Sequence, residues 1–269
     1  MKWDKQEIIN EFKRIEKNLG RKPVKRDNAN LYFLSRKHFG SWNNLIEKSG
    51  YKVRRFQNPQ IPDVLSNEVY YLLGLLCTDG HIQFRKNECK YRLILFTSYN
   101  EEKEMIIKLI KNIFDYNASV REKLYGFSNR PNYEVYISSK KVCEFFNNLG
   151  VPYGNKSTSL RVPKVLFHLN KDKTFNFLRG VFDGDGSIIF SSINQTFKIS
   201  SGSQKFIEDM HKLMSKLNIN SSRITHERDN IWELKLNKEK EIKKLYNLLY
   251  LDSKFYYPRK KLKWSQRYI

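Results

Sequence analysis

The sequence is poor in the residues from which many functional sites are built. It has 3 cysteines and 5 histidines in 269 residues. The irregular spacing of Cys77, Cys89 and Cys143 excludes a zinc-finger pattern and a disulfide framework. It favours reduced thiols in an intracellular protein, of the cytoplasm or an organelle matrix. Because the histidines show no paired metal spacing either, any metal chemistry is expected to use carboxylates and a hard cation.

Long apolar runs and acidic residues are also scarce. No apolar run is long enough to span a membrane, and the opening MKWDKQEIINEF lacks the core of a signal peptide, so no membrane partner is expected. Asp and Glu number 28 against 50 Lys and Arg, a formal net charge of +22. Such an excess favours a polyanionic partner, most often nucleic acid, over a ribosome-associated or merely solvated basic surface.

The first 56 residues are expected to form a small helical DNA-binding module. Apolar residues recur there at helical spacing: Ile8, Ile9, Phe12, Ile15 and Leu19. Two further short helices are expected on either side of Gly40 and Ser41. Residues 1–60 hold 15 Lys or Arg and 6 Asp or Glu, and a basic three-helix unit suits a helix-turn-helix reader of DNA. The alternative is a packing unit with a solvated basic face. Residues 57–67 have the composition of a linker.

Beyond the linker the sequence repeats itself. YLLGLLCTDGHI (71–82) is echoed by FLRGVFDGDGSI (177–188), 106 residues later. Each copy is followed by alternating stretches and amphipathic stretches that predict two strands, a helix, two strands and a helix. The sequence therefore predicts two equivalent halves, 68–158 and 174–265, joined by 159–173.

The repeated motif places small residues and an acid at fixed positions. Residues four apart share one helix face, and in both copies this face carries small residues: Gly74 and Thr78, Gly180 and Gly184. Such a stripe lets two helix backbones approach closely. Gly80 and Gly186 stand where a left-handed residue would end each helix. We therefore expect the two motif helices to pack together and to bring Asp79 and Asp185 side by side.

Two neighbouring carboxylates at two negative helix ends are electrostatically unfavourable, and one of them would tend to hold a proton. A divalent cation removes the conflict, and carboxylates with water and phosphate oxygens are a usual setting for Mg²⁺. The same arrangement suits metal-assisted hydrolysis of a phosphodiester. One such motif alone would most often be a buried helix with a capped end. Two copies in a strongly basic chain favour the catalytic interpretation.

LLGLLCTDG and LRGVFDGDG resemble the two signature motifs of the LAGLIDADG homing endonucleases, in their single-chain, two-repeat form. The resemblance covers about residues 68–265. It implies an α+β fold in which two pseudo-symmetric αββαββα halves form a DNA-binding saddle, preceded by the three-helix module. It also implies a monomeric, site-specific endonuclease that cuts both strands of double-stranded DNA across the minor groove, leaving short 3′ overhangs, with Mg²⁺ as cofactor and Mn²⁺ as a substitute.

The resemblance also assigns roles within the motifs. The eighth motif position binds the metal in that family, which here means Asp79 and Asp185, and we place Gly80 and Gly186 in the same metal site. The sixth position is Asp183 in the second motif but Cys77 in the first. Because the family varies at this position, Asp183 is expected to be structural and Cys77 to leave activity intact.

Basic residues close each half, in GNKS (154–157) and YPRKKLKW (257–264). A lysine near this point commonly reaches the active site in the family, where it stabilises developing charge or helps to activate water. The resemblance points to Lys156 and Lys260 as catalytic residues, with Lys261 as a further candidate; ordinary phosphate contact is the alternative. EIINEFKRIEKNLGRKPVKRD…FGSWNNLIEKSG similarly resembles the helical repeat often attached to homing endonucleases and implies an accessory DNA-contacting module.

Alternation along the strands assigns one face of each hairpin to DNA. Five apolar residues are expected to be buried: Tyr91, Leu93, Leu95, Phe197 and Ile199. Their neighbours then face outward as candidate DNA contacts: Gln83, Arg85, Lys90 and Arg92 in the first half, and Ser191, Thr196 and Lys198 in the second. Arg and Gln suit base edges and Lys suits phosphates, the alternative being a solvated strand face.

Two rival functions use the same fold. A non-catalytic DNA-binding regulator would have no need of both motif aspartates. An RNA maturase that helps a host intron to splice could retain them, and would add intron RNA to the partners. Nicking of DNA with Mg²⁺ and splicing of the flanking transcript are the assays that separate these functions.

Overall fold

The computed structural model describes residues 3–53, 58–88, 90–124, 131–191, 195–220, 222–226 and 231–265. The chain divides into two compact units, Met1–Phe56 and Gln57–Ile269. Within the described residues, no helix is long and apolar enough to cross a membrane. Cys77 and Cys143 are buried free thiols, whereas Cys89 lies outside the described residues.

The first unit consists of three helices around a small apolar core. They are α1 (Lys5–Leu19), α2 (Ala29–Phe39) and α3 (Trp42–Lys48). Asp4 and Glu7 form a capping box at the start of α1, and Gly20 ends that helix in the left-handed conformation, with φ 63°. The core draws on all three helices: Ile8, Phe12, Leu31, Trp42 and Leu45. The predicted three-helix module is thus confirmed.

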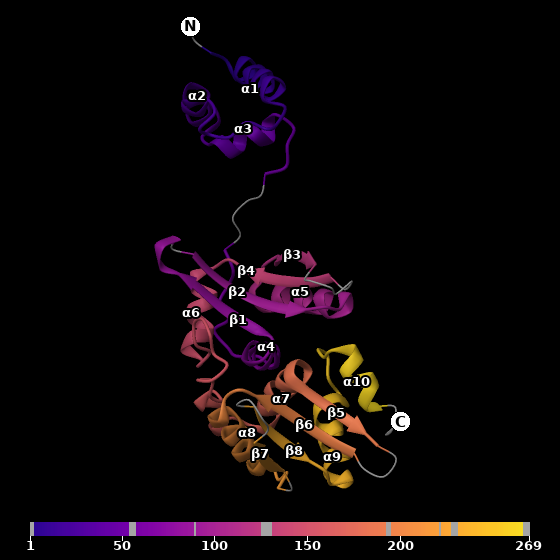
Figure 1. Cartoon of the computed structure of the whole chain (residues 1–269). Coiled ribbons are helices and arrows are strands. Elements are labelled where there is room, and N and C mark those ends of the chain that lie inside the picture. The colour runs from indigo at the N-terminus through magenta and orange to yellow at the C-terminus, as the bar shows by residue number, and fades with distance from the viewer. Residues whose placement is uncertain are drawn as a thin grey trace. The chain divides into compact units, whose positions relative to one another are not determined.

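The second unit contains the two predicted halves (Figure 1). The first half consists of α4 (Asn67–Cys77), β1 (Gly80–Arg85), β2 (Lys90–Thr97), α5 (Asn100–Phe114), β3 (Ser119–Leu124), β4 (Pro131–Ile137) and α6 (Lys140–Asn148). The second consists of α7 (Lys171–Asp185), β5 (Gly186–Phe190), β6 (Gln195–Ser201), α8 (Gln204–Lys216), β7 (Arg223–His226), β8 (Trp232–Leu236) and α9 (Glu239–Tyr250). Both have the order αββαββα, which confirms the predicted fold class. Short 3₁₀ turns lie at Lys86–Glu88 and Lys164–His168.

Each half contains one antiparallel sheet of four strands. The strand orders are β1-β2-β4-β3 and β5-β6-β8-β7, so the two sheets have the same topology. The registers match as well: Leu95 pairs with Val135 in the first sheet, and Ile199 pairs with Leu234 in the second. These four side chains are buried on the helix-facing side of their sheets. One continuous core joins the two halves through α4 and α7.

The motif helices α4 and α7 pack backbone to backbone at the centre of this unit. A Cβ atom added to Gly74 would lie 2.2 Å from the carbonyl oxygen of Phe177, and one added to Gly180 would lie 2.2 Å from that of Tyr71. Side chains at these positions would force the helices apart, so the two glycines permit the approach. The helix α4 has no polar face because every residue from Val69 to Cys77 is buried, between its twin helix and its sheet.

The glycines that follow the two acids do not end the helices as expected. Gly186 has φ −75° and ψ 151°, and neither Gly80 nor Gly186 is among the glycines with positive φ. The left-handed expectation is therefore wrong, and each glycine is the first residue of a strand. Glycine is required there by space, since a Cβ atom would lie 2.6 Å from Leu76 Cα at Gly80 and 2.5 Å from the Phe182 carbonyl oxygen at Gly186.

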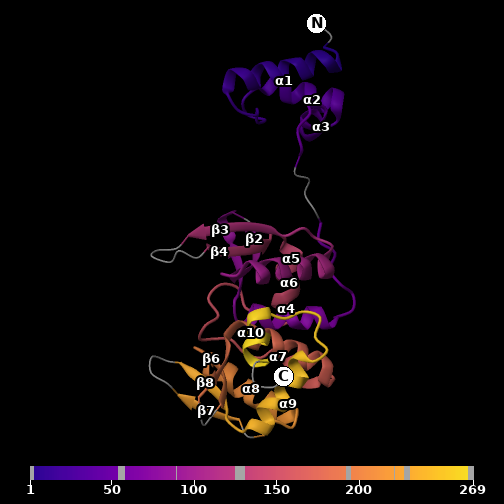
Figure 2. The same ribbon diagram turned by 90° about the vertical axis from the view of Figure 1, so that its right-hand side faces the viewer.

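The C-terminal segment contains a helix that the sequence pattern did not predict. The helix α10 (Pro258–Ser265) begins at a proline, whose fixed φ suits a first helical turn. It buries Trp264 against the ring of Phe182, at 4.8 Å between ring centroids. In both views α10 lies near α7 (Figures 1 and 2). This packing attaches the basic segment firmly to the second half.

Candidate active site

The structure brings the two motif aspartates to one place. The helix α4 ends at Cys77, so that Asp79 lies in the link to β1, whereas Asp185 is the last residue of α7. A Cβ atom added to Gly184 would lie 2.0 Å from Thr78 Oγ1 and 3.3 Å from Asp79 Oδ2. The carboxylate of Asp79 therefore lies against the backbone beside Asp185.

The electrostatic conflict expected for this pair is present. Burial raises the pKa of Asp79 to about 6; the negative charge of Asp185 adds to the rise and Lys260 opposes it. Burial also raises the pKa of Asp185, even though this residue keeps an exposed surface, and Lys156 and Lys260 oppose that rise. Both carboxylates thus keep raised pKa values in spite of the lysines, and a bound cation would favour their ionised forms.

Both candidate lysines reach the ends of the motif helices. The Nζ atom of Lys156 donates to the Thr78 carbonyl at 2.9 Å, and that of Lys260 donates to the Gly186 carbonyl. Burial lowers the pKa of both lysines. Lys261 lies instead over the ring of Tyr256, with Nζ 4.3 Å from the centroid. The geometry therefore favours Lys260 over Lys261 as the lysine of the second half.

The lysines couple to the aspartates across the two halves. Asp79, from the first half, is opposed chiefly by Lys260 of the second. Asp185, from the second half, is opposed first by Lys156 of the first. The two halves thus contribute jointly to each acid and lysine pair.

The residues present fit a hard divalent cation. Within the described residues, no three His, Cys, Asp or Glu side chains form a cluster that could hold a metal ion. Two carboxylates with raised pKa values are nevertheless the donor set that Mg²⁺ accepts when water and phosphate oxygens complete its coordination. The Gly186 carbonyl is already bonded to Lys260, and Gly80 pairs with Leu95 in the sheet. The carboxylates are accordingly the better metal-ligand candidates.

A basic groove of about 610 Å³ opens beside Asp79 on the strands of the first half. The candidate DNA contacts face one another in the register, with Gln83 paired with Arg92 and Arg85 paired with Lys90. Except for Lys90 these residues line the groove, together with three that the sequence analysis missed: Arg121, Lys123 and Glu134. The alternation in SVREKL (119–124) was the signal that could have identified the two basic ones.

The second half presents an equivalent but differently charged face. Lys198 lies opposite Ser187 and Thr196 opposite Ile189. Ser191, the third candidate of this half, follows the end of β5, which stops at Phe190. Two further residues were missed here: Glu233 and Lys235. Although burial favours a higher value, hydrogen bonds from Lys198, Lys235 and Ser200 hold the pKa of Glu233 at about 2.

The expected burial of the strands is mostly observed. Leu93, Leu95, Phe197 and Ile199 are buried. Tyr91 is only half-buried, because it lies near the end of its hairpin, where its ring stacks on that of Phe84 at 4.6 Å.

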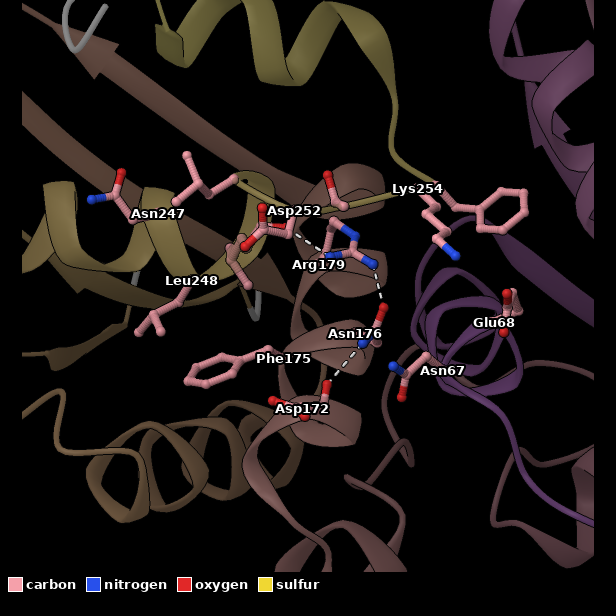
Figure 3. Close-up of a pocket in the computed structure, with 14 residues that line it drawn as sticks. Asn67, Glu68, Asp172, Phe175, Asn176, Arg179, Asn247, Leu248, Asp252 and Lys254 are labelled. Carbon is pink, nitrogen blue, oxygen red and sulfur yellow. Dashed lines mark hydrogen bonds between the residues drawn. The ribbon is translucent and has the colours of Figure 1, made fainter.

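A second hollow, of about 640 Å³, lies at the start of the motif helices and close to the end of α9. Figure 3 shows Arg179 projecting from α7 toward Asn176 and the chain after α9. Its guanidinium donates to the Leu249 carbonyl at 2.7 Å. None of the site residues predicted from the sequence lines this hollow.

Comparisons with known proteins agree with this geometry. The family model described as "LAGLIDADG-like domain" matches residues 66–150 and 172–249, which is more than half of the chain. A second family model, described as "Homing endonuclease associated repeat", matches residues 3–52. The chain therefore belongs to the LAGLIDADG homing endonuclease family, with two such domains and an N-terminal associated repeat.

Two relatives show how the chain compares with whole proteins. Homing endonuclease I-DmoI of Desulfurococcus mucosus is 30% identical over 115 residues, which are 40% of this chain and 59% of that protein. The replication factor C small subunit of Methanocaldococcus jannaschii is 28% identical over 170 residues, which are 59% of this chain and 8% of that protein. The chain thus spans only part of these relatives.

Solved structures share the fold. The homing endonuclease I-WcaI, bound to its DNA recognition sequence, has a TM-score of 0.57 at 15% identity, over 76% of this chain and 88% of that one. I-DmoI in complex with DNA and Mn has a TM-score of 0.51 at 17% identity, over 68% and 97%. At these identities the likeness establishes the fold of two joined αββαββα halves.

Proposed function

We propose that this protein is a site-specific double-strand DNA endonuclease, acting as a monomer with Mg²⁺, for which Mn²⁺ can substitute. The observation that carries the proposal is the meeting of Asp79 and Asp185 at the ends of two helices in backbone contact. Both acids have raised pKa values, and a groove lined by basic strand residues opens beside Asp79. Together these features suit hydrolysis of a polyanionic phosphodiester.

The comparisons support the choice of substrate and metal. I-WcaI was solved on its DNA recognition sequence, and I-DmoI with DNA and Mn. Because this chain belongs to the same family, we propose double-stranded DNA and a divalent cation for it as well. The N-terminal module, which matches the homing endonuclease associated repeat, would add contacts to the same DNA.

Each set of residues has a distinct task in this proposal. Asp79 and Asp185 would hold the cation, with the backbone of Gly80 and Gly186 beside them. When bound, the cation would lower the pKa of the attacking water and neutralise charge on the phosphate. Lys156 and Lys260, held at the helix ends, would stabilise the charge that develops during hydrolysis.

The remaining polar residues of the strands would bind the duplex. In the first half these are Gln83, Arg85, Lys90 and Arg92, joined by Arg121 and Lys123. In the second half they are Thr196, Lys198 and Ser191. Arg and Gln side chains offer the donors that base edges in the major groove accept, while lysines neutralise phosphates.

Substitution of the two acids tests the proposal. The substrate is a plasmid that carries the DNA flanking the gene, joined without interruption. Asp79→Asn and Asp185→Asn should each abolish linearisation with Mg²⁺ but leave the mobility shift of the DNA intact, because they remove metal ligands and no DNA contact. Asp252→Asn, in the hollow at the other end of α7, is the control. Full cleavage by the double variant would contradict the proposal.

The same preparations distinguish the rival functions. A protein that binds the junction but leaves it uncut with Mg²⁺ or Mn²⁺ would be a regulator. A protein that accelerates splicing of the flanking transcript would be an RNA maturase. The presence of both motif acids favours the nuclease over the regulator.

A further inference from the structure

The two motif helices differ in residue type at two equivalent positions. Arg179 and Asp183 lie one helical turn apart on α7 and are buried. The equivalent residues of α4 are Leu73 and Cys77. The second half therefore has a buried arginine and a buried aspartate where the first has a leucine and a cysteine. Burial of such groups is unfavourable unless each finds partners, so the partners indicate what the groups do.

The partners of Asp183 lie on α4, at the end of α9 and on the segment that leads to α10. Its carboxylate has no exposed surface and accepts from the backbone amide of Tyr257 at 2.9 Å. It also accepts from the hydroxyl of Tyr71, on α4, at 2.8 Å and from that of Tyr250, at the end of α9. One carboxylate thus fixes both ends of the connection between α9 and α10.

A second buried acid fixes the next turn of this segment. Arg259 donates from Nε to Glu102 Oε1 at 2.6 Å, and Glu102 is 2% exposed. Glu102 belongs to α5 of the first half and also accepts from Thr97. The guanidinium lies over the ring of Tyr99, at 4.5 Å from the centroid. The segment is therefore held by Asp183 at residue 257 and by Glu102 at residue 259, and Lys260 follows directly.

The lysine of the first half is placed by different means. Its loop is fixed by the backbone, with the Gly154 amide donating to the Ile82 carbonyl at 2.9 Å. Tyr153 forms a bridge with Ile82, and its ring lies 5.9 Å from that of Phe84. These contacts join the loop to β1, and neither Asp183 nor Glu102 takes part in them.

We propose that Asp183 and Glu102 are positioning residues for Lys260, and that through it they govern cleavage of one DNA strand and not the other. This inference rests on the proposed nuclease function. A displacement of about 1 Å can slow an enzymatic step by about 100-fold. Release of the segment should therefore impair the strand served by Lys260, while the strand served by Lys156 is cut at its normal rate.

Strand-specific labelling measures this effect. Lys260→Met and Lys156→Met first identify the strand that each lysine serves. Asp183→Cys, which copies the residue of the first half, should slow the Lys260 strand by about 10- to 100-fold and cause nicked plasmid to accumulate. The paired variant Glu102→Gln with Arg259→Gln replaces the ion pair of the second anchor by neutral side chains. It should slow cleavage of the same strand, and it replaces Asp183→Cys in this test if that variant folds poorly.

A matched control separates positioning from loss of stability. Asp209 is a buried aspartate of the same half. Within the described residues its hydrogen bonds come from Arg161, at 2.5 Å, and from the Val162 amide, neither of which belongs to the α10 segment. Asp209→Cys should lower stability yet slow both strands equally. In addition, Asp183→Cys should cause no further strand-specific loss in a Lys260→Met background, since residues that act through one group are not additive.

Hydrogen exchange provides a measurement that does not depend on nuclease activity. The Tyr257 amide and the first turn of α10 should exchange faster in Asp183→Cys than in Asp209→Cys. Unchanged exchange, or equal slowing of both strands, would overturn the inference and leave the nuclease function intact. Absence of any cleavage by the unaltered protein would instead overturn the proposed function, and this inference with it.

Discussion

The two halves of the second unit share a backbone plan but not the chemistry of their connections. Both have the strand order 1-2-4-3 within their sheets, and both carry a buried glutamate, Glu134 or Glu233, between basic residues on the outer face. The first motif helix is apolar at Leu73 and Cys77, whereas the second has Arg179 and Asp183. Repetition of a fold therefore requires repetition of its apolar pattern, while polar anchors can diverge between copies.

The strongest test of this comparison introduces the second half's acid into the first. Cys77→Asp places a carboxylate where the thiol is 3% exposed and where the neighbouring Leu73 offers no donor. Although Lys156 lies near enough to affect the pKa of this thiol, a buried carboxylate without the hydrogen-bond donors of Asp183 should lower the free energy of unfolding by about 1–3 kcal/mol or more. Urea denaturation measures the loss, with Cys77→Ala as the uncharged control. Equal stability of the two variants would show that the first half can also accommodate an acid.

A second test separates the two kinds of close contact between the motif helices. Gly180→Ala should cost about 1–3 kcal/mol or more, because its Cβ atom would meet the Tyr71 carbonyl, which is backbone. Gly184→Ala would meet side chains instead, chiefly that of Thr78 at 2.0 Å and less closely that of Asp79 at 3.3 Å. Thr78→Gly should therefore restore the stability of Gly184→Ala but not that of Gly180→Ala. Rescue of both, measured by thermal unfolding, would contradict backbone contact at Gly180.

The sequence was sufficient to predict what depends on local pattern. Periodicity and the repeat predicted the αββαββα halves, and the stripe of small residues predicted the approach of α4 and α7. The anchors of Asp183 could not be found in this way, because Tyr250 and Tyr257 lie 67 and 74 residues further along the chain. Glu102 and Arg259 are separated by 157 residues. No local pattern records such contacts, which depend on how the second half folds back onto the first.

The pH dependence of metal binding should show whether Asp79 is a metal ligand. The pKa of Asp79 in the folded protein is about 6, above the ordinary value of about 3.9. Its protonated form therefore contributes stability that is present below pH ~4 and is lost as the pH rises through about 6. A cation needs the ionised form, so the rise in melting temperature caused by Mg²⁺ should be larger at pH 7.5 than at pH 5. Affinity should fall by up to about tenfold per pH unit below 6, or ~1.4 kcal/mol. A Mg²⁺ effect that is equal at both pH values, or unchanged in Asp79→Asn, would contradict metal binding at this carboxylate.

The smallest effects are expected on the outer faces, where the halves can be compared charge for charge. Lys198 pairs with Glu233 at 2.6 Å and Arg121 with Glu134 at 3.3 Å. Each glutamate has a second basic partner, so Lys198→Ala and Arg121→Ala should each change stability by no more than about 1 kcal/mol. If both faces contact phosphates, each variant should reduce the slope of log affinity against log salt by about 0.9. Lys212→Ala, on the exposed side of α8, is the control. If the salt dependence changed for the variant of one half alone, only that half's outer face would contact DNA phosphates.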